Sequence, residues 1–339
     1  MRKLCLVASC LSFLSFFMNA QTKAISSLND FVDTRMRVII DNDFSGDPDG
    51  LFQLAHHLLS PSVDIRGIIG SHVSMGFTEA PATATEACRK VNELLEVMGL
   101  SGEYKVLEGS NTPMDTLTVP KESEGARFII EEAMRTDTKQ PLYVVCGASL
   151  TTIASAYLMN PEIADRLTLV WIGGQEYEGL AVPPPGYSIP EYNLGLCVPA
   201  AQTIFNLSSI PIWQVPRDVY RQCIYSMAEM LTDVDPMSKT GHFLTMELTR
   251  LMKGLGEHGF YMGEVYILGD SPLVLLTALQ SGFQPDPASS QYVIKQAPEI
   301  ADDGIYRYNP NGRSIRVYTY VDVRLMFQDM VAKFKLAGQ

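Results

Sequence analysis

The order of apolar and polar positions predicts alternating strands and helices along most of the chain. The continuous apolar run at 142–146 and the mostly apolar stretches at 65–69 and 167–172 are typical of buried strands. Between such runs, apolar residues recur every three or four positions, as they do on helices that cover a sheet; one of these helices spans 84–98. The alternation predicts an α/β fold, with a mostly parallel sheet and helices on both faces.

Two segments depart from this alternation. Residues 177–192 are rich in Pro and Gly, which predicts a long irregular loop after a strand. Near the end, 291–297, 305–308 and 314–320 have strand patterns, which predicts a small antiparallel appendage before a last helix from Asp322. No repeat or change of composition divides residues 21–339, so we expect a single domain there.

The first 20 residues have the layout of a secretory signal peptide. Arg2 and Lys3 precede a mostly apolar run that ends near residue 18, and the small residue Ala20 follows. This pattern predicts cleavage after Ala20 and an exported, periplasmic protein. The run is short for a membrane span. A lipoprotein is the less favoured alternative, because only a few apolar residues precede Cys10.

Composition narrows the choice of partners. Of 339 residues, 46% are hydrophobic and 19% are charged, which is typical of a globular protein. The formal net charge of −12 argues against DNA or RNA, whose phosphates attract Lys and Arg. The four cysteines beyond the signal peptide are far apart and form no CxxC pair, so we expect small buried apolar side chains at these positions. They are Cys88, Cys146, Cys197 and Cys223.

The stretch 37–59, RVIIDNDFSGDPDGLFQLAHHLL, holds the strongest chemical signal. A short apolar strand leads into four aspartates, and a helix with one apolar face follows: the acids are Asp41, Asp43, Asp47 and Asp49. Parallel sheets bind ligands at the carboxyl ends of their strands. Crowded carboxylates repel one another unless a cation neutralises them, and such hard oxygen ligands suit Ca²⁺ or Mg²⁺. An EF-hand is excluded, because Phe52 stands where its bidentate glutamate is needed; a solvated acidic turn is the simpler alternative.

Five segments, in order between residues 37 and 282, resemble the nucleoside hydrolase family. DNDFSGDPDG resembles the family's aspartate motif, and the text after it resembles the family's first helix and second strand. Three later segments resemble its Gly-Pro-Leu-Thr-Asn, Glu-Phe-Asn and His-Asp-Pro-Leu regions: they are 144–174, 189–206 and 268–279. The resemblance implies the α/β fold of these hydrolases, which supports the pattern of strands and helices.

The resemblance also implies roles for particular residues. Asp43 matches the aspartate that binds Ca²⁺ and takes a proton from the attacking water. Thr151 matches a residue whose main-chain carbonyl binds the metal, and Asp270 matches a second carboxylate ligand. Glu191 and Asn193 match a pair that hydrogen-bonds the ribose hydroxyls. Ca²⁺ lowers the pKa of a bound water, and a carboxylate can remove its proton.

Several positions depart from the family's pattern. The family's adjacent aspartate pair is replaced here by Asp47 and Asp49, so we expect one to bind the metal and the other the sugar. Gly269 stands where the family has its leaving-group histidine, and Ser74 stands near a family asparagine. His72 is a candidate for the lost polar contacts to the substrate. Candidates for the missing acid are His258, Tyr261, Glu264 and Tyr266.

The predicted function is Ca²⁺-dependent hydrolysis of the N-glycosidic bond of a ribonucleoside or a related ribosyl compound, by a homodimer or homotetramer. One alternative is a protein that binds a nucleoside or sugar without catalysis, and another is a hydrolase of a different glycosyl substrate. A phosphotransferase or phosphatase is a further alternative, since Asp41 and Asp43 could form a nucleophilic DxD loop. It has less support because no matching downstream Thr, Lys and acidic segments follow.

Overall fold

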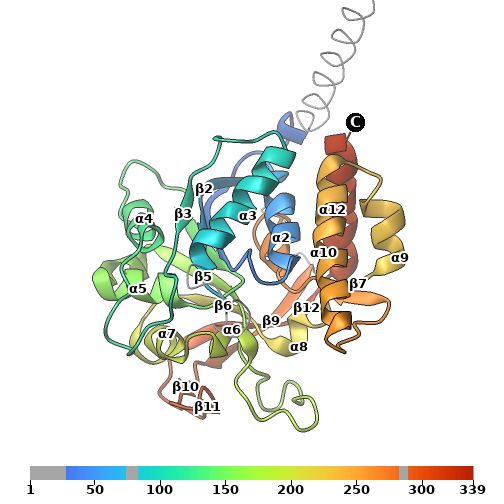
Figure 1. Cartoon of the computed structure of the whole chain (residues 1–339). Coiled ribbons are helices and arrows are strands. Elements are labelled where there is room, and N and C mark those ends of the chain that lie inside the picture. The colour runs from blue at the N-terminus through green and yellow to red at the C-terminus, as the bar shows by residue number, and fades with distance from the viewer. Residues whose placement is uncertain (1–27, 74–82, 282–288, 339) are drawn as a thin grey trace, which may run out of the picture.

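The computed structural model describes residues 28–73, 83–281 and 289–338 (Figure 1). The predicted signal peptide and Ser74 lie outside these ranges. The main sheet has eight strands in the order β3-β2-β1-β4-β5-β6-β12-β9. They are β1 (Met36–Asn42), β2 (Val63–Gly70), β3 (Val106–Glu108), β4 (Leu142–Cys146), β5 (Leu167–Ile172), β6 (Ile212–Val215), β9 (Ser290–Gln296) and β12 (Ser314–Val321). All described neighbours in this sheet are parallel except β9 and β12.

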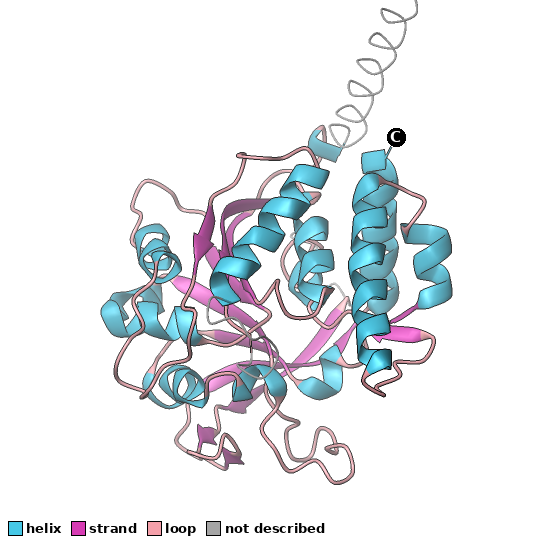
Figure 2. Cartoon of the chain, viewed as in Figure 1, coloured by secondary structure: helices cyan, strands magenta, loops and turns pink. Residues whose placement is uncertain are grey.

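Helices cover both faces of the sheet (Figure 2). The longer ones are α2 (Asp49–Leu58), α3 (Thr83–Val97), α4 (Glu124–Ala133), α5 (Thr151–Met159), α10 (Lys239–Glu257) and α12 (Val323–Gly338). Short ones are α6 (Tyr192–Gly195), α7 (Val198–Gln202), α8 (Arg217–Tyr220), α9 (Met227–Glu229) and α11 (Pro272–Leu275), together with single turns at Pro161–Asp165, Thr203–Leu207 and Met230–Val234. The predicted mostly parallel α/β fold is therefore confirmed.

The alternation of side chains along β1 explains the two layers. Val38 and Ile40 point into a core with α2, α3, α10 and α12, whereas Ile39 points into a second core with α4, α5 and α7. All seven residues of β1 are buried, as in a central strand covered by helices on both faces. The hydrophobic effect of these two cores fixes where the strand ends, and thus where Asp43 begins the acidic loop.

The C-terminal segment is antiparallel, as predicted, and most of it joins the main sheet. β12 pairs with β6 in parallel and with β9 in antiparallel fashion. The separate small sheet is the hairpin of β10 (Glu299–Ile300) and β11 (Tyr306–Arg307). A third small sheet, which the sequence analysis did not predict, joins β7 (Ile224–Ser226) to β8 (Val265–Ile267).

Two other expectations concern the long loop and the cysteines. Residues 177–191 contain neither helix nor strand, in agreement with the predicted loop. The four expected buried cysteines are all buried with free thiols. Within the described ranges, no helix has the length and apolar character needed to cross a membrane.

Candidate active site

The aspartate loop lies at the topological switch point of the sheet, where the strand order reverses. From β1 the chain continues to β2 on one side, and β4 and β5 follow on the other side of β1. In open parallel sheets, the carboxyl ends of two such neighbouring strands form a crevice that binds ligands. Here Asp43 directly follows β1 and Gly147 directly follows β4. A cavity of about 360 Å³ lies at this point, with Asp43, Asp47, Asp49 and Asp270 all in its wall.

Asp49 and Asp270 meet although they are 221 residues apart in the sequence. The main-chain N–H of Asp270 donates to Asp49 Oδ2 at 3.2 Å. Asn42 Nδ2 donates to Asp270 Oδ2 at 2.8 Å, and Asn42 Oδ1 accepts from the main-chain N–H of Asp43 at 2.9 Å. Asn42 thus links the main chain at Asp43 to the Asp270 carboxylate, a role that no sequence pattern indicated.

Asp47 occupies a different place from Asp49. Its side chain is exposed, and its Oδ1 accepts from the main-chain N–H of Asp49 at 3.0 Å, which shapes the turn before α2. Tyr266 lines the same cavity, and burial, followed by the charge of Asp47, raises the pKa of its hydroxyl. Asp49 therefore lies with Asp270 inside the cavity, while Asp47 lies toward its opening.

Burial and mutual repulsion both favour protonation of these acids. Burial, followed by the charges of Asp270 and Asp47, raises the pKa of Asp43 well above its ordinary value. The same causes raise the pKa of Asp49 well above its ordinary value. Burial raises the pKa of Asp270 to about 8, although the hydrogen bond from Asn42 opposes it. The strongest neighbouring charges are carboxylates, so the site lacks the positive charge that would let all its acids ionise together.

The chemistry of these donors fits a hard cation. Asp43 and Asp270 are buried and Asp49 is half-buried, and their oxygens have no compensating positive charge beside them. Such ligands suit Ca²⁺ or Mg²⁺. A Cβ on Gly147 would lie only 2.6 Å from Asp270 Oδ2, so the glycine leaves room beside this carboxylate. In the described part of the chain, however, no three His, Cys, Asp or Glu side chains form a ready-made metal site. The carboxylates would therefore have to close in on a bound cation, with main-chain carbonyls or water completing the shell.

Glu191 and Asn193 lie on the other side of the cavity, where the long loop meets α6. Glu191 Oε2 accepts from the main-chain N–H groups of Gly174 and Leu194, at 2.7 and 3.1 Å, and Oε1 accepts from the Tyr220 hydroxyl at 2.7 Å. Asn193 Nδ2 donates to the carbonyls of Gly147 and Ile172.

These contacts give both residues a structural task. Glu191 caps α6, while Asn193 ties the ends of β4 and β5 together. Both side chains nevertheless line the cavity, and sugar binding by this pair stays a prediction.

Thr151 and His72 contact one another, and neither is among the residues that line the cavity. Thr151 begins α5, and its hydroxyl lies 3.0 Å from His72 Nε2; Ser149 Oγ lies 3.1 Å from the same nitrogen. His72 is buried, and burial lowers the pKa of its ring. Its ring faces the start of α5 rather than the wall residues, so substrate binding by His72 stays a prediction.

Of the four candidate acids, Tyr266 alone is in the cavity wall. Tyr261 is 84% exposed, and both His258 and Glu264 are exposed outside the wall. Tyr266 is 5% exposed, and burial raises the pKa of its hydroxyl, so it keeps its proton at neutral pH.

The glycine in place of the family histidine has a physical counterpart in Tyr220. A Cβ on Gly269 would lie 3.3 Å from the Tyr220 ring and 3.4 Å from Asp49 Oδ2. Tyr220 thus fills the space that a larger side chain at 269 would need. No spacing in the sequence indicated Tyr220, because its helix has only four residues and begins 48 residues before β8, the next strand of the site.

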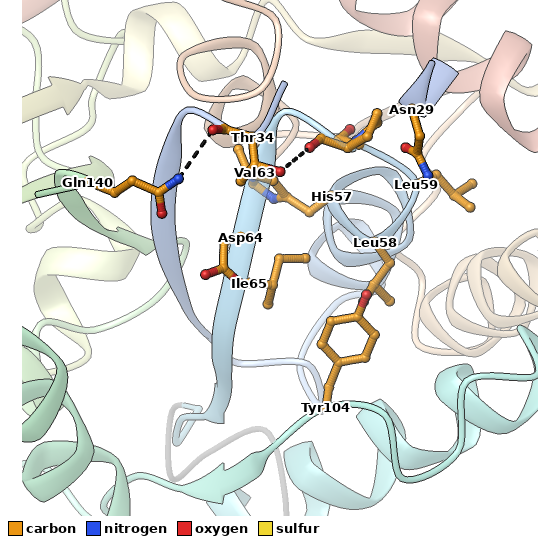
Figure 3. Close-up of a pocket in the computed structure, with 12 residues that line it drawn as sticks. Asn29, Thr34, His57, Leu58, Leu59, Val63, Asp64, Ile65, Tyr104 and Gln140 are labelled. Carbon is orange, nitrogen blue, oxygen red and sulfur yellow. Dashed lines mark hydrogen bonds between the residues drawn. The ribbon is translucent and has the colours of Figure 1, made fainter. Parts of the chain in front are cut away.

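A second cavity lies at the opposite edge of the sheet, beside the amino end of β2. It measures about 510 Å³ (Figure 3). Its wall includes Val63, Asp64 and Tyr104, and hydrogen bonds from Gln140 to Thr34 and from Thr34 to Pro61 cross its margin. None of the aspartates that line the first cavity lies there, so we assign the candidate active site to the first cavity.

The acid-rich cavity lies at the strand ends, where α/β proteins with an open parallel sheet bind small ligands. Residues 38–323 match the model of the inosine-uridine preferring nucleoside hydrolase family, and the chain belongs to that family. Enzymes of this family generally use a metal ion and act on small nucleosides. No curated protein matches the chain by sequence.

Solved structures agree with this fold at low sequence identity. A plant nucleoside hydrolase has a TM-score of 0.67 at 17% identity, covering 89% of this chain and 99% of its own. A purine-preferring ribonucleoside hydrolase from Gardnerella vaginalis has the same TM-score and coverage at 20% identity. The type III effector XopQ, solved with adenosine diphosphate ribose, has a TM-score of 0.58 at 14% identity, covering 94% and 96%. The low identities confirm that this member is divergent.

Proposed function

We propose that the protein hydrolyses the N-glycosidic bond of a ribonucleoside, or of a related ribosyl compound, with the help of Ca²⁺. The observation that carries the proposal is the convergence of Asp43, Asp49 and Asp270 on one cavity from distant parts of the chain. Asp43, Asp49 and Asp270 would hold the ion, together with the main-chain carbonyl of Thr151. The Ca²⁺ would supply positive charge that lowers the pKa of a nearby water.

The protein's own residues account for the remaining steps. Asp43 would accept the proton of the water that attacks C1′ of the sugar. Asp47, Glu191 and Asn193 would bind the sugar hydroxyls, because all three line the same cavity. The buried negative charge favours an oxocarbenium-like transition state. Tyr266, with its hydroxyl protonated, would donate to the departing base in place of the family's histidine.

The setting of the enzyme is also proposed. The charged n-region and apolar run of residues 1–20 support export to the periplasm. The family resemblance supports a homodimer or homotetramer of single-domain chains. The net charge of −12 supports a small nucleoside, rather than a nucleic acid, as the partner.

The direct test is release of p-nitrophenol from p-nitrophenyl β-riboside by the full chain, with Ca²⁺ and with a chelator. This leaving group needs little protonation, so the assay is independent of Tyr266. We expect release that the chelator abolishes and that Asp43→Ala lowers by at least about 1,000-fold. Asp115→Ala is the matched control, because Asp115 is exposed and pairs only with Lys121 among the described residues.

Two results would overturn the proposal. Release that persists unchanged under chelation would exclude the metal. Absence of release from protein that binds Ca²⁺ would exclude a ribosidase and would favour another glycosyl substrate or a protein that binds without catalysis.

A further inference from the structure

A row of buried polar side chains follows helix α2 away from the acid-rich cavity. Asn42, Gln53, His57 and Thr277 are each 0% exposed, and each hydrogen-bonds the next. Gln53, His57 and Thr277 lie on or next to α2 and α11, whose apolar residues share one core with α12. Buried polar groups destabilise a protein unless they are paired, so the order of donors and acceptors along this row is constrained.

The main chain fixes the first member. The N–H of Asp43 can only donate, and it lies 2.9 Å from Asn42 Oδ1. Asn42 Nδ2 must then face the other way, toward Asp270 Oδ2 at 2.8 Å and Gln53 Oε1 at 3.3 Å. The amide nitrogen has two protons and can serve both acceptors.

The same reasoning fixes the rest of the row. Since Gln53 Oε1 accepts from Asn42, Gln53 Nε2 must donate to His57 Nδ1. His57 therefore carries its proton on Nε2 and donates to Thr277 Oγ1 at 2.9 Å. The Thr277 hydroxyl in turn donates to the Leu273 carbonyl at 2.6 Å. Burial lowers the pKa of His57 well below its ordinary value, in agreement with a neutral ring.

We propose that Gln53, His57 and Thr277 are positioning residues, which together with the main-chain N–H of Asp43 hold Asn42 in the one orientation that donates to Asp270. The inference rests on the proposed function, in which Asp270 binds the metal. If His57 offered no acceptor, Gln53 could turn and present its nitrogen to the nitrogen of Asn42. Two donors would then face each other. Asn42 could relieve this repulsion only by shifting or turning, which would weaken its donation to Asp270 Oδ2 and its acceptance from the N–H of Asp43.

The row acts along the length of the helix. Asp49 begins α2, and His57 lies eight residues later, so about 12 Å of helix separates the cavity from the imidazole. Figure 3 shows His57 beside the second cavity, at the far end of α2. A residue without contact to the substrate thus determines how a carboxylate of the active site is presented.

Two substitutions at His57 separate positioning from stability. In His57→Asn, the shorter side chain places its oxygen near the former Nδ1, so Gln53 keeps its acceptor and Thr277 loses its donor. In His57→Gln, the longer side chain places its terminal group near the former Nε2. Thr277 then keeps a hydrogen-bond partner, whereas Gln53 loses its acceptor. Each variant breaks one buried hydrogen bond. His56→Gln is the matched control, because the adjacent His56 contacts Asp329 and not this row.

We would measure Ca²⁺ affinity by calorimetry, kcat and KM on p-nitrophenyl β-riboside, and the melting temperature of the full chain. We expect His57→Gln to weaken Ca²⁺ binding and lower kcat by about tenfold at nearly unchanged KM. His57→Asn and His56→Gln should stay within about threefold of the wild type in both quantities. A purely structural role would lower the melting temperature of both His57 variants without separating their Ca²⁺ affinities.

Equal Ca²⁺ affinities for the two His57 variants would overturn the inference, whatever their activities. If the wild type binds Ca²⁺ but releases no p-nitrophenol, the proposed hydrolysis fails. The order of Ca²⁺ affinities would still decide whether the row positions Asp270.

Discussion

His56 is a buried histidine whose protonation the fold opposes, and this has a measurable effect on stability. Its ring is 0% exposed, and Nε2 donates to Asp329 Oδ2 at 2.7 Å. Lys333 Nζ lies 2.6 Å from the same oxygen, so Asp329 already has a cation beside it. In the described chain, Nδ1 of His56 has no hydrogen-bond partner, and a proton placed there would be buried without an acceptor. Burial lowers the pKa of His56 to about 4.

The size and sign of the effect follow from the two pKa values. The unfolded chain has an ordinary histidine with a pKa of about 6.5, so below that pH it binds a proton that the folded protein excludes. The contribution of His56 is complete above pH 6.5 and is lost as the pH falls toward 4. At pH 5.0 the loss is about 2 kcal/mol, from about 1.4 kcal/mol for each of one and a half pH units.

Urea unfolding of the wild type and of His56→Gln at pH 7.5 and pH 5.0 measures this contribution. Glutamine can donate to Asp329 but does not titrate, and the titration of His57 is common to both proteins. As the pH falls from 7.5 to 5.0, we expect the free energy of unfolding of the wild type to decrease by about 2 kcal/mol more than that of His56→Gln. A difference that stays constant within about 0.5 kcal/mol would refute the assignment of a neutral, unpaired Nδ1.

Three further predictions concern the site. Tyr266→Phe should slow hydrolysis of inosine about 100-fold but leave p-nitrophenyl β-riboside within about threefold, because an acid is needed only for the poorer leaving group; equal losses in steady-state kinetics would exclude it as the acid. Tyr220→Phe removes a donor to the buried Glu191 carboxylate and should lower kcat/KM about tenfold, whereas an unchanged kcat/KM would show that this hydrogen bond does not orient the sugar site. Glu176→Gln leaves the buried guanidinium of Arg217 without its carboxylate and should destabilise the protein by about 3–5 kcal/mol in urea unfolding; a loss below about 1 kcal/mol would contradict the burial of this pair.

The sequence predicted the elements that local patterns specify. The apolar run before Asp41 predicts β1, because a strand buried on both faces is apolar at successive positions. The apolar residues after Asp49 recur every three or four positions and predict α2, because this spacing places them on one face of a helix. The third strand is harder to predict. β3 has only three residues, Val106–Glu108, which are too few positions to define where the strand starts.

The pairing of distant residues could not be predicted from such patterns. The resemblance indicated Asp270 as a ligand, but its hydrogen bond with Asn42 joins residues 228 positions apart. Asn42 itself looked like one more polar residue in an acidic loop. The hydrogen bond from Tyr220 to Glu191 could not be predicted either, because Tyr220 lies on a helix of four residues, which is too short to show a helical period.

Helix α2 combines these two kinds of information. Its apolar positions predicted a helix with one buried face, yet in the structure Gln53, His56 and His57 on its other faces are buried as well. A helix buried all round is usually apolar all round. Here the polar side chains divide into two separate networks. His56 joins Asp329 and holds α12 against α2, whereas Gln53 and His57 lead to Asn42 and the acidic cavity. His56 and His57 are adjacent and equally buried, but His56 serves stability and His57 serves the geometry of the site. His56→Gln should therefore change mainly the pH dependence of stability, and His57→Gln mainly the affinity for Ca²⁺.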